Sequence, residues 1–506
     1  MDEIELKVLI DAAAERRLRR HPALRRFGNG PAKTARLVSI YYDTEDGALA
    51  SAGIALRLRR KGDTWVQTVK IGRSLTAGLS EAVESDTPVG GEQLDLPAIA
   101  DDRARIAVLK ATNGADLHAV YRSDIRRTTR LLAIPDAGEV ELAIDVGEIV
   151  AGDRSEPLRE VELEARTGGA AATFAAARVL FDRTPVHFSR RTKAERGALL
   201  RAEGRIEDPL HPRRARPVAI KPKQRLAEAL PVMLAECLEQ IDWNAAVVRH
   251  SDDPEGPHQL RIGLRRLRTI AETLPGEAAA HLVAEARWLG REVGRLRDLD
   301  VLSRELVAPA LATHPGDDGL AALRSALVGA AETTRAELHR TLASPRVQHL
   351  LLDLAEMVSL PTVGDTGLGN PRMEKFARKV LEQCFAKAAK RGRKIDSLTT
   401  EERHALRKAL KRLRYAADFF APIFPAPRVK AFGKRLRRLQ ETLGLLNDHA
   451  MAEEVLADRH LPGLDAPAVA FAAGRIVGHL ATRFDDAWPS AKGDWAALAK
   501  AHPFWT

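Results

Sequence analysis

The chain has 506 residues, 45% of them hydrophobic, which is enough apolar material for about three domains of the usual ~100–200 residues and excludes general disorder. Its formal net charge of +10 and pI near 9.7 favour a polyanionic partner such as nucleic acid, an acidic membrane surface or polyphosphate. The two cysteines, Cys237 and Cys384, lie far apart in helix-like sequence, which excludes a disulfide framework and the usual ligand spacing of a zinc site.

Two features of the sequence bear on the compartment. The N-terminus is acidic and has no apolar signal segment, and no run approaches the ~18 apolar residues of a membrane span. We therefore expect a soluble, cytoplasmic protein in a reducing environment, with no membrane partner.

Residues 1 to about 200 alternate polar and apolar side chains in the way that half-buried strands do. The predicted strands are Ile4–Ile10, Leu37–Tyr42, Ile54–Arg60, Trp65–Ile71, Glu139–Val146 and Val161–Ala165, and the predicted helices are Ala12–Arg20 and Ala170–Phe181. The pattern predicts an α+β domain over residues 1–202, built around an antiparallel sheet or barrel.

The sequence changes character after this domain. The stretch "EDPLHPRRARPVAIKPKQ" is rich in proline and basic residues, so residues 203–222 are predicted to be a linker. From about Lys223 onward strand signals vanish, and Ala, Leu, Arg and Glu recur at helical spacing. A second break, "SLPTVGDTGLGNPR" at 359–372, divides this all-α region, 223–500, into halves of about 223–358 and 372–500.

The two helical halves repeat one another. "HQLRIGLRRLR" from His258 and "HALRKALKRLR" from His404 share the pattern His-x-Leu-Arg-x-x-Leu-basic-Arg-Leu-Arg. Further along, "LGREVGRLRDLD" aligns with "LQETLGLLNDHA", with Asp298 and Asp448 at matching positions. Two similar helical halves are therefore expected.

Each repeat places a one-sided basic stripe on a helix. The stripes are His258, Arg261, Arg265 and Arg268 in the first repeat, and His404, Arg407, Lys411 and Arg414 in the second; Lys430, Lys434 and Arg437 extend the second. Like charges at this spacing cost ~0.2–0.5 kcal/mol per pair, and the stripes hold no acid that offsets it. A bound polyanion explains them better than a solvated face, although the two histidines fit a structural role as well as a phosphate contact.

The residue types narrow the choice of polyanion. Single-stranded nucleic acid binding usually interleaves aromatic residues, which are only 5% of this chain and absent from both stripes apart from Tyr415, which follows the second. Duplex recognition needs a groove-entering motif, and none is found. Bare phosphate chains need only Lys and Arg, so nucleic acid is disfavoured.

At this point the repeats carry a family resemblance. The duplicated His-x-Leu-Arg motif, with "GRLRDLD" and "GLLNDHA" downstream, resembles the CHAD domain, the conserved histidine α-helical domain. The resemblance covers about residues 223–500. It implies two four-helix bundles related by pseudo-twofold symmetry, with a basic channel that binds inorganic polyphosphate.

Several strands of the first region also carry charge on one face. Acids lie on the first and two late strands, at Glu3 and Glu5, at Glu139, Glu141 and Asp145, and at Glu160, Glu162 and Glu164; Arg57, Arg59, Lys70 and the "RSDIRR" basics lie on middle strands. A closed sheet would bring the carboxylates opposite the basic groups. Carboxylates suit magnesium or manganese and basic groups suit phosphate oxygens, a combination used in metal-assisted phosphoryl transfer or hydrolysis. No Gly-rich phosphate loop of the Walker type is present.

A second resemblance enters here. "EIELK" at 3–7 resembles the Glu-x-Glu-x-Lys signature of the CYTH superfamily, the triphosphate tunnel metalloenzymes. It is followed in order by "IYYDT" at 40–44, "LRLR" at 56–59, "VQTVK" at 66–70, "VELAIDVGE" at 140–148, "EVELE" at 160–164 and "TKAERG" at 192–197. The resemblance covers about residues 1–200 and implies an antiparallel eight-stranded tunnel barrel.

The resemblance also implies residue roles. Carried over by position, the metal ligands are Glu3, Glu5, Asp145, Glu162 and Glu164, the triphosphate ligands are Lys7, Arg57, Arg59, Lys70, Arg127 and Lys193, and Glu3, Glu5 and Lys7 form the catalytic centre. The basic residues near 127 do not align uniquely, so Arg122, Arg126 or Arg130 is an alternative to Arg127. Lys33 and Glu81 are further candidates, and Glu141 and Glu160 are either ligands or supporting charges.

A CYTH domain followed by a CHAD domain resembles bacterial inorganic triphosphatases. This implies a hydrolase that cleaves triphosphate to pyrophosphate and phosphate with Mg²⁺ or Mn²⁺, and that binds polyphosphate, with polyphosphate granules as an expected location. The alternatives are an enzyme for an organic triphosphate, of the adenylate cyclase or thiamine triphosphatase type, and a non-catalytic protein that targets polyphosphate granules.

Overall fold

A computed structural model describes residues 2–61, 64–72, 75, 78–182, 184–185, 187–360, 369–457, 461 and 463–506, without the side chains of residues 2, 3, 61 and 81. Its internal contacts divide the chain into two compact units. The first comprises residues 1–210 and 343–360, and the second comprises residues 211–342 and 361–506. Each unit is described by itself.

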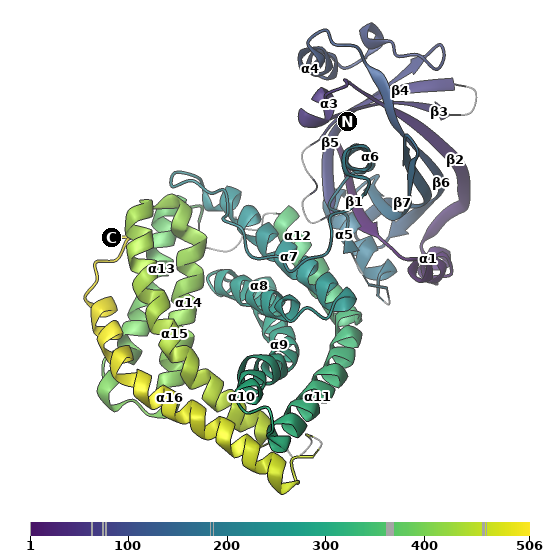
Figure 1. The fold of residues 1–506 in the computed structure, drawn as a ribbon. Coiled ribbons are helices and arrows are strands. Elements are labelled where there is room, and N and C mark those ends of the chain that lie inside the picture. The colour runs from purple at the N-terminus through teal and green to yellow at the C-terminus, as the bar shows by residue number, and fades with distance from the viewer. Residues whose placement is uncertain are drawn as a thin grey trace. The chain divides into compact units, whose positions relative to one another are not determined.

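The first unit is built on antiparallel strands. These are β1 (Asp2–Leu9), β2 (Gly28–Asp43), β3 (Ile54–Lys61), β4 (Thr64–Gly72), β5 (Leu79–Val89), β6 (His118–Ile134), β7 (Gly138–Ala151), β8 (Arg154–Ala165) and the two-residue β9 (His187–Phe188). The pairing order is β5-β4-β3-β2-β6-β7-β8-β1-β9, and β1 also pairs with β5. The curled sheet therefore returns on itself, so that one of its faces is turned inward (Figure 1).

Helices cover this sheet and enter its curve. They are α1 (Ala12–Arg19), α2 (Ala23–Arg26), α3 (Ala48–Ser51), the 3₁₀ turn η1 (Leu96–Ala98), α4 (Asp102–Thr112), α5 (Gly169–Leu180) and α6 (Lys193–Glu203). Helix α6 lies within the curve of the sheet (Figure 1). Helix α12 (Pro345–Ser359) also belongs to this unit, where Arg178 of α5 donates to Asp353 at 2.6 Å.

Strand alternation decides what each face of the sheet carries. On β1, Leu6 and Val8 are fully buried on the face that α5 covers, whereas Glu5 and Lys7 point into the interior of the curve. Part of the apolar core of this unit thus lies outside the curled sheet, while Leu200 of α6 packs against Ile125 and Ile149 within the curve. The rest of the interior is lined largely by charged side chains.

Three strands, β5, β6 and β9, were absent from the predicted ranges, and β2, β7 and β8 are longer than predicted. Strand β5 has small and acidic residues in place of a clear apolar face, and β6 carries basic residues on both faces. Strand β2 begins at Gly28 because its exposed first half pairs with β6. In each case pairing with neighbouring strands, rather than local alternation, stabilises the strand.

The rest of the chain is helical, as predicted. The elements are α7 (Leu226–His250), α8 (Glu255–Ala271), α9 (Glu277–Asp300), the π-helix η2 (Val301–Val307), α10 (Ala308–Thr313), α11 (Asp318–Leu342), α13 (Met373–Gly392), η4 (Ile395–Ser397), α14 (Thr400–Phe420), η5 (Ala421–Ile423), α15 (Ala426–Leu456) and α16 (Pro467–Ala499). Helices α8 and α9 lie side by side, as do α14 and α15 (Figure 1). Among the described residues, no helix combines the length and the apolar character that a membrane crossing requires.

Candidate active site

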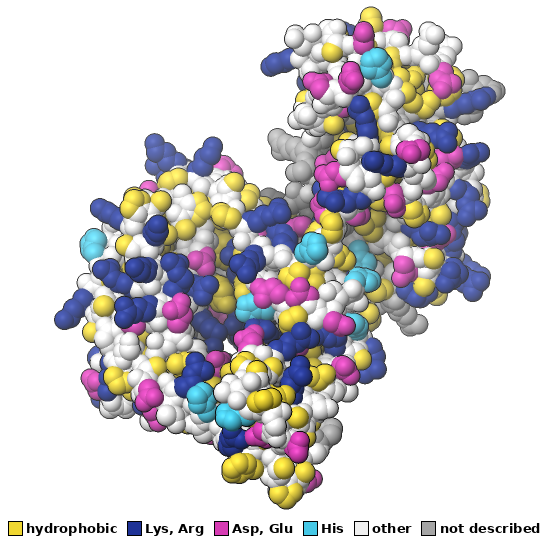
Figure 2. All heavy atoms as spheres, in the orientation of Figure 1, with side chains coloured by type: hydrophobic (Ala, Val, Ile, Leu, Met, Phe, Trp, Pro, Cys, Tyr) yellow, Lys and Arg dark blue, Asp and Glu magenta, His cyan; other side chains and the backbone are white. Residues whose placement is uncertain are grey.

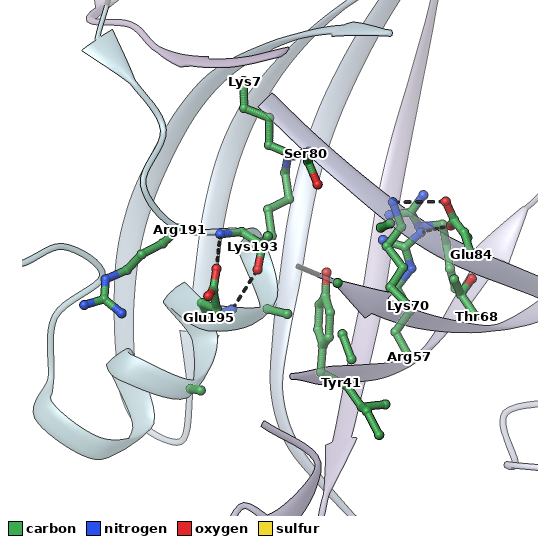
Figure 3. A pocket seen from close by; sticks show the side chains of 18 of the residues that line it. Lys7, Tyr41, Arg57, Thr68, Lys70, Ser80, Glu84, Arg191, Lys193 and Glu195 are labelled. Atoms are coloured by element: carbon green, nitrogen blue, oxygen red, sulfur yellow. Dashed lines mark hydrogen bonds and ion pairs between the residues drawn. The ribbon is translucent and has the colours of Figure 1, made fainter. Parts of the chain in front are cut away.

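A cavity of about 720 Å³ lies inside the curled sheet of the first unit. Lys7, Arg57, Arg59, Lys70, Arg127 and Lys193 line it together with the acids Glu5, Glu84, Glu141, Glu162 and Glu164. Figure 3 shows Lys7 and Lys193 near one another, with Tyr41 between them and the group of Arg57, Lys70 and Glu84. Strands from both ends of the domain thus place their charged side chains around one space.

The strand register sets the acids in rows across the sheet. Glu141 on β7 is paired with Glu164 on β8, which is paired with Glu5 on β1. In the next row, Glu162 of β8 is paired with Lys7 of β1. Because paired residues have Cβ atoms about 4.5–5.5 Å apart, each row forms a compact group of charges.

Lys193 is at the centre of a buried ion-pair cluster. Its Nζ lies 2.6 Å from Glu160, 2.7 Å from Glu162 and 2.9 Å from Asp145. Lys7 contacts Glu162 and Glu5, each at 2.7 Å. Buried ionic groups of this kind are tolerated only when each charge has partners, and here every carboxylate has at least one.

Helix α6 begins at Lys193, the central cation of this cluster. The side chain of Thr192 accepts a hydrogen bond from the backbone N–H of Glu195 at 3.2 Å, and the side chain of Glu195 accepts one from the Thr192 N–H at 2.7 Å. This capping box fixes the first turn of the helix. Lys193 and Arg196, three residues apart, then face the sheet, where Arg196 donates to Glu160 at 3.0 Å.

Another group of cations lines the wall formed by β3 and β4. Arg57 contacts Glu84 at 3.1 Å and Lys70 contacts the same carboxylate at 3.0 Å. Arg59 donates from Nε to the hydroxyl of Ser39 at 2.9 Å. Within the described residues Arg59 has no carboxylate in ion-pair contact, so its positive charge is the least compensated in this wall.

The pKa shifts follow from this arrangement. Burial alone would lower the pKa of Lys193, but Asp145, Glu160 and Glu162 raise it well above its ordinary value. Burial and the repulsion of Arg57 lower the pKa of Arg59 to about 10. A negatively charged phosphate oxygen beside Arg59 would offset this repulsion.

The acids of the cavity differ in how far they are neutralised. Asp145, Glu160 and Glu162 have ligand atoms within 4.8 Å of one another, the right donors for a divalent cation. They are already paired, however, with Lys7, Arg127, Lys193 and Arg196.

The row of Glu141, Glu164 and Glu5, which we call the outer row, has fewer cation partners. Arg166 contacts both Glu141 and Glu164, and Lys7 contacts Glu5. Burial raises the pKa of Glu164, and the negative charges of Glu141 and Glu5 raise it further in spite of Arg166. Crowded carboxylates of this kind fit a hard divalent cation, so the residues present suit a metal and the outer row suits it best.

The basic stripes lie on α8 and α14 of the second unit. Burial lowers the pKa of Lys411 to about 6 and that of Arg407 to about 10, and in both the charges of Arg265 and Arg261 contribute. Helices α8 and α14 are in contact, and because charges act strongly only at short range, the two stripes lie close to one another. They form one concentrated positive site.

Some stripe residues have acid partners, contrary to the expectation that nothing offsets them. Arg261 contacts Asp298 at 2.8 Å, and Arg268 contacts Glu272 at 3.5 Å. These acids come from α9 and from the end of α8, outside the motif itself. The pKa values of His258 and His404 are lowered by burial and then by neighbouring arginines, so neutral imidazoles add little charge to the stripes.

Helix α15 adds an exposed basic face. Lys430, Lys434 and Arg437 are all exposed to solvent on it. Lys and Arg side chains gather where α14 and α15 lie (Figure 2). Burial raises the pKa of Asp418, and the charges of Arg414 and Arg437 both oppose this rise. Arg437 of this face therefore lies near Arg414, the last residue of the second stripe.

Comparison with known proteins identifies the two parts of the chain. The CYTH domain pattern matches residues 1–198, and the CHAD domain pattern matches residues 232–457. The CHAD domain of the plant Ricinus communis is 30% identical, with a TM-score of 0.51, and the match covers 57% of this chain and 97% of that one. The chain consists of a CYTH domain followed by a CHAD domain.

Relatives of the CYTH domain are more distant. The inorganic triphosphatase of Haemophilus influenzae is 27% identical over 208 residues, which are 41% of this chain and 57% of that protein, so the match spans less than two thirds of this relative. A putative adenylyl cyclase from Hippeastrum, described as having a dominant triphosphatase activity, is 22% identical over 40% of this chain and 96% of its own, with a TM-score of 0.30.

Most residues predicted for the CYTH site meet in its cavity. Arg127 lines the cavity and donates to Asp145 at 2.8 Å, whereas Arg122, Arg126 and Arg130 have the opposite strand parity and lie on the other face of β6. Asp145 is fully buried behind the cavity and does not line it. Lys33 is exposed, away from the cavity.

The side chains of Glu3 and Glu81 lie outside the described residues, although both residues belong to paired strands. On β1, Glu3 has the same parity as Glu5 and Lys7.

The CYTH site also contains residues that were not predicted from the sequence. Arg196 is fully buried on α6, and Glu84 on β5 bridges Arg57 and Lys70. Tyr41 stacks on Tyr121 with ring centroids 4.8 Å apart. "TKAERG" and "IYYDT" contained Arg196 and Tyr41, but helical arginines and strand tyrosines most often serve packing or solvation, so the sequence alone did not distinguish them.

Proposed function

We propose that the CYTH domain hydrolyses inorganic triphosphate to pyrophosphate and phosphate with a divalent cation, and that the CHAD domain binds polyphosphate. The observation that carries the first part is the cavity in which Lys7, Arg57, Arg59, Lys70, Arg127 and Lys193 lie beside Glu5, Glu162 and Glu164. A site for a neutral substrate has no use for so many cations, and a site for a bare anion has no use for the acids.

The cations would bind the phosphate chain and stabilise charge in the transition state. Arg57 and Arg59 offer forked donors to phosphate oxygens, and Lys70 adds a point charge beside them. Lys7 and Lys193 lie across the cavity (Figure 3). As water attacks and the P–O bond to the leaving pyrophosphate breaks, negative charge develops on the leaving oxygen, and fixed donors stabilise it without reorganisation.

A divalent cation, Mg²⁺ or Mn²⁺, would be held by Glu5 and Glu164, with Glu141 and Glu3 as further candidates. When bound it supplies Lewis acidity and neutralises charge on the phosphate oxygens. The inner acids Asp145 and Glu162 would instead orient Arg127, Lys193 and Lys7, which they contact directly. This assigns a positioning role to Asp145 rather than metal ligation.

The facing stripes of α8 and α14 support polyphosphate binding by the CHAD domain. Burial and then the neighbouring arginines of the stripes lower the pKa of Lys411, and a bound polyanion would offset the repulsion from those arginines. Competition of labelled polyphosphate against DNA and RNA at fixed salt tests this. If DNA or RNA displaced polyphosphate efficiently, nucleic acid would be assigned as the ligand instead.

One observation favours a second candidate substrate. The stacked pair of Tyr41 and Tyr121 lines the same cavity, beside apolar residues such as Ile54 and Leu199. A planar organic group could contact such a wall, as in a nucleoside or thiamine triphosphate. The bare phosphate chain remains the first choice because the cations line the cavity from several sides.

A substrate panel tests the proposal. Tripolyphosphate, ATP and thiamine triphosphate would be given to the full chain with Mg²⁺ or Mn²⁺, and phosphate release would be measured. The full chain is needed because residues 343–360 cluster with the first unit. We expect the highest kcat/KM with tripolyphosphate and loss of release on chelation; release unaffected by chelation would refute a metal-dependent hydrolase.

A further inference from the structure

A cavity of about 480 Å³ lies in the helical unit, apart from the facing stripes. It is formed by α13, by the C-terminal end of α8 and by Arg412 of α14. Arg412 follows Lys411 directly, and consecutive helical residues point about 100° apart, so this cavity opens on another side of α14. Its volume is within the range of about 300–1,000 Å³ that small-ligand sites occupy.

The charge of this cavity is strongly positive. Lys375, Lys379 and Lys387 of α13 line it together with Arg412, and Glu272 is the acid in its lining. In the part of the chain that the structure describes, the three lysines make no ion pair or hydrogen bond. The site therefore has several donors for an anion.

Glu272 does not neutralise them. Its carboxylate is 2.5 Å from Arg412, 3.5 Å from Arg268 and 3.8 Å from Arg287. One negative charge is thus shared among three arginines. The Nε of Arg412 is buried and makes no hydrogen bond, which leaves one donor of this guanidinium unsatisfied.

The internal repeat shows that the fold does not require this cavity. Arg412 occupies the same position in the second repeat as Arg266 in the first, and Glu272 corresponds to Asp418. The arrangement is reciprocal, since Arg412 contacts Glu272, and Arg266 is close enough to Asp418 for its charge to oppose the rise in pKa that burial causes there. The two halves can therefore be compared position by position.

At one position the halves differ in size. Phe419 of the second repeat covers Arg266, with its ring centroid 4.1 Å from the guanidinium carbon. The corresponding residue beside Arg412 is Thr273, which lines the cavity. A threonine in place of a phenylalanine leaves this space open.

The lysines are also specific to one half. Cys384 of α13 and Cys237 of α7 contact the corresponding arginines, Arg412 and Arg266, which aligns the two helices. With this alignment, Lys375, Lys379 and Lys387 correspond to Glu228, Val232 and Gln240. Packing of the helical halves therefore does not explain the three lysines.

We propose that this cavity binds a small phosphate-bearing anion, either inorganic pyrophosphate or a nucleotide. Lys375 and Lys379 are four residues apart and so lie on one face of α13 with Lys387 two turns further on. Their ammonium groups and Arg412 provide the donors that phosphate groups take. Phe376 and Val380 also line the cavity, and a nucleotide base could pack against these apolar residues.

Hydrogen–deuterium exchange of the full chain tests this locally, because the CYTH domain yields separate peptides. Pyrophosphate or ATP would be added without divalent cations, and protection would be followed in peptides from α13 and residues 271–275. Thr273→Phe fills the cavity as Phe419 does in the other half, without a change of charge. Lys379→Glu with Lys387→Glu reverses exposed charges, and Lys390→Glu is the matched control on the same helix, outside the lining.

We expect protection of α13 that both cavity variants weaken about tenfold or more in apparent affinity and that Lys390→Glu leaves nearly unchanged. Protection by ATP alone identifies a nucleotide, and equal protection by pyrophosphate identifies the inorganic anion. Absence of protection in α13, or protection that persists in both cavity variants, overturns the proposal. Thermal unfolding of each variant confirms that it is folded.

Discussion

The ammonium groups of Lys7 and Lys193 donate to the same carboxylate oxygen, Oε1 of Glu162, each at 2.7 Å. The two lysines come from the first strand and from α6, almost the whole domain apart in sequence. Arg127 contacts the other oxygen of this carboxylate. Glu162 therefore holds three cations of the cavity wall in position against their mutual repulsion.

Removal of this shared charge should destabilise the CYTH domain. Glu162→Gln removes the charge of a buried acid that three cations contact, and removal of one partner of a buried ion pair costs about 3–5 kcal/mol. We expect the free energy of unfolding, from denaturant titration in the presence of a chelator, to fall by that amount. Glu148→Gln on the outer face of β7 should cost about 0.5 kcal/mol or less; equal stability of the two variants would contradict the positioning role of Glu162.

Gly197 is predicted to control the cavity through Tyr121. A Cβ atom at this position would lie 2.1–2.2 Å from the Tyr121 ring, and Tyr121 stacks on Tyr41. Gly197→Ala should displace both rings and with them Arg57, to which Tyr41 is hydrogen-bonded. We expect kcat/KM for tripolyphosphate to fall about tenfold or more.

The matched control is Gly90→Ala, because a Cβ atom there meets nothing within 4 Å. It should retain the activity of the unmodified protein. Full activity of Gly197→Ala would show that the tyrosine pair does not position Arg57.

Lys411 should destabilise the CHAD domain when no ligand is bound. Its pKa falls from 10.5 to about 6 in the folded protein, so between these pH values the unfolded chain binds more protons and stability rises with pH. Lys411→Met should raise the free energy of unfolding at pH 6 by about 1 kcal/mol, because it removes a poorly compensated charge. It should also reduce the rise in stability from pH 6 to 9 and weaken polyphosphate binding; a variant less stable than the unmodified protein would be inconsistent with this account.

Polyphosphate binding should take up protons. At pH 8 Lys411 is largely neutral in the free protein, and an adjacent polyanion raises its pKa, so that up to about one proton binds per site at this residue. Calorimetric titrations in buffers with different ionisation enthalpies measure this number directly. Lys411→Met should abolish most of the uptake, whereas unchanged uptake in that variant would assign it to another group.

The sequence predicted the inward-facing charges of the CYTH domain well because strand alternation is local. Glu5, Lys7, Arg57 and Arg59 needed only the parity of their strands. The choice of Arg127 over its neighbours needed the register between β6 and β7, which pairs it with Asp145. Register depends on long-range pairing and is not visible in a single strand.

Other features of the site depend on tertiary packing. Arg196 is buried because Glu160 and Glu207 meet it there, and nothing in "TKAERG" indicates those partners. In the CHAD domain the duplicated motif predicted two stripes, but their juxtaposition follows from how α8 and α14 pack. Packing of α9 against α8 brings Asp298 to Arg261, and Glu272 reaches Arg268 from the end of α8, although the sequence suggested that both arginines were unopposed.

The most direct test of the central claim compares phosphate release from tripolyphosphate by the full chain and by its Glu5→Gln and Glu148→Gln variants with Mg²⁺ or Mn²⁺. Glu5 lies in the carboxylate row of the cavity, whereas Glu148 lies on the outer face of the same sheet. We predict metal-dependent release by the unmodified chain and by Glu148→Gln, and a loss of about 100-fold or more with Glu5→Gln, the magnitude typical of removing a group that stabilises transition-state charge. Undiminished release by Glu5→Gln would contradict the assignment of this cavity as the site of hydrolysis.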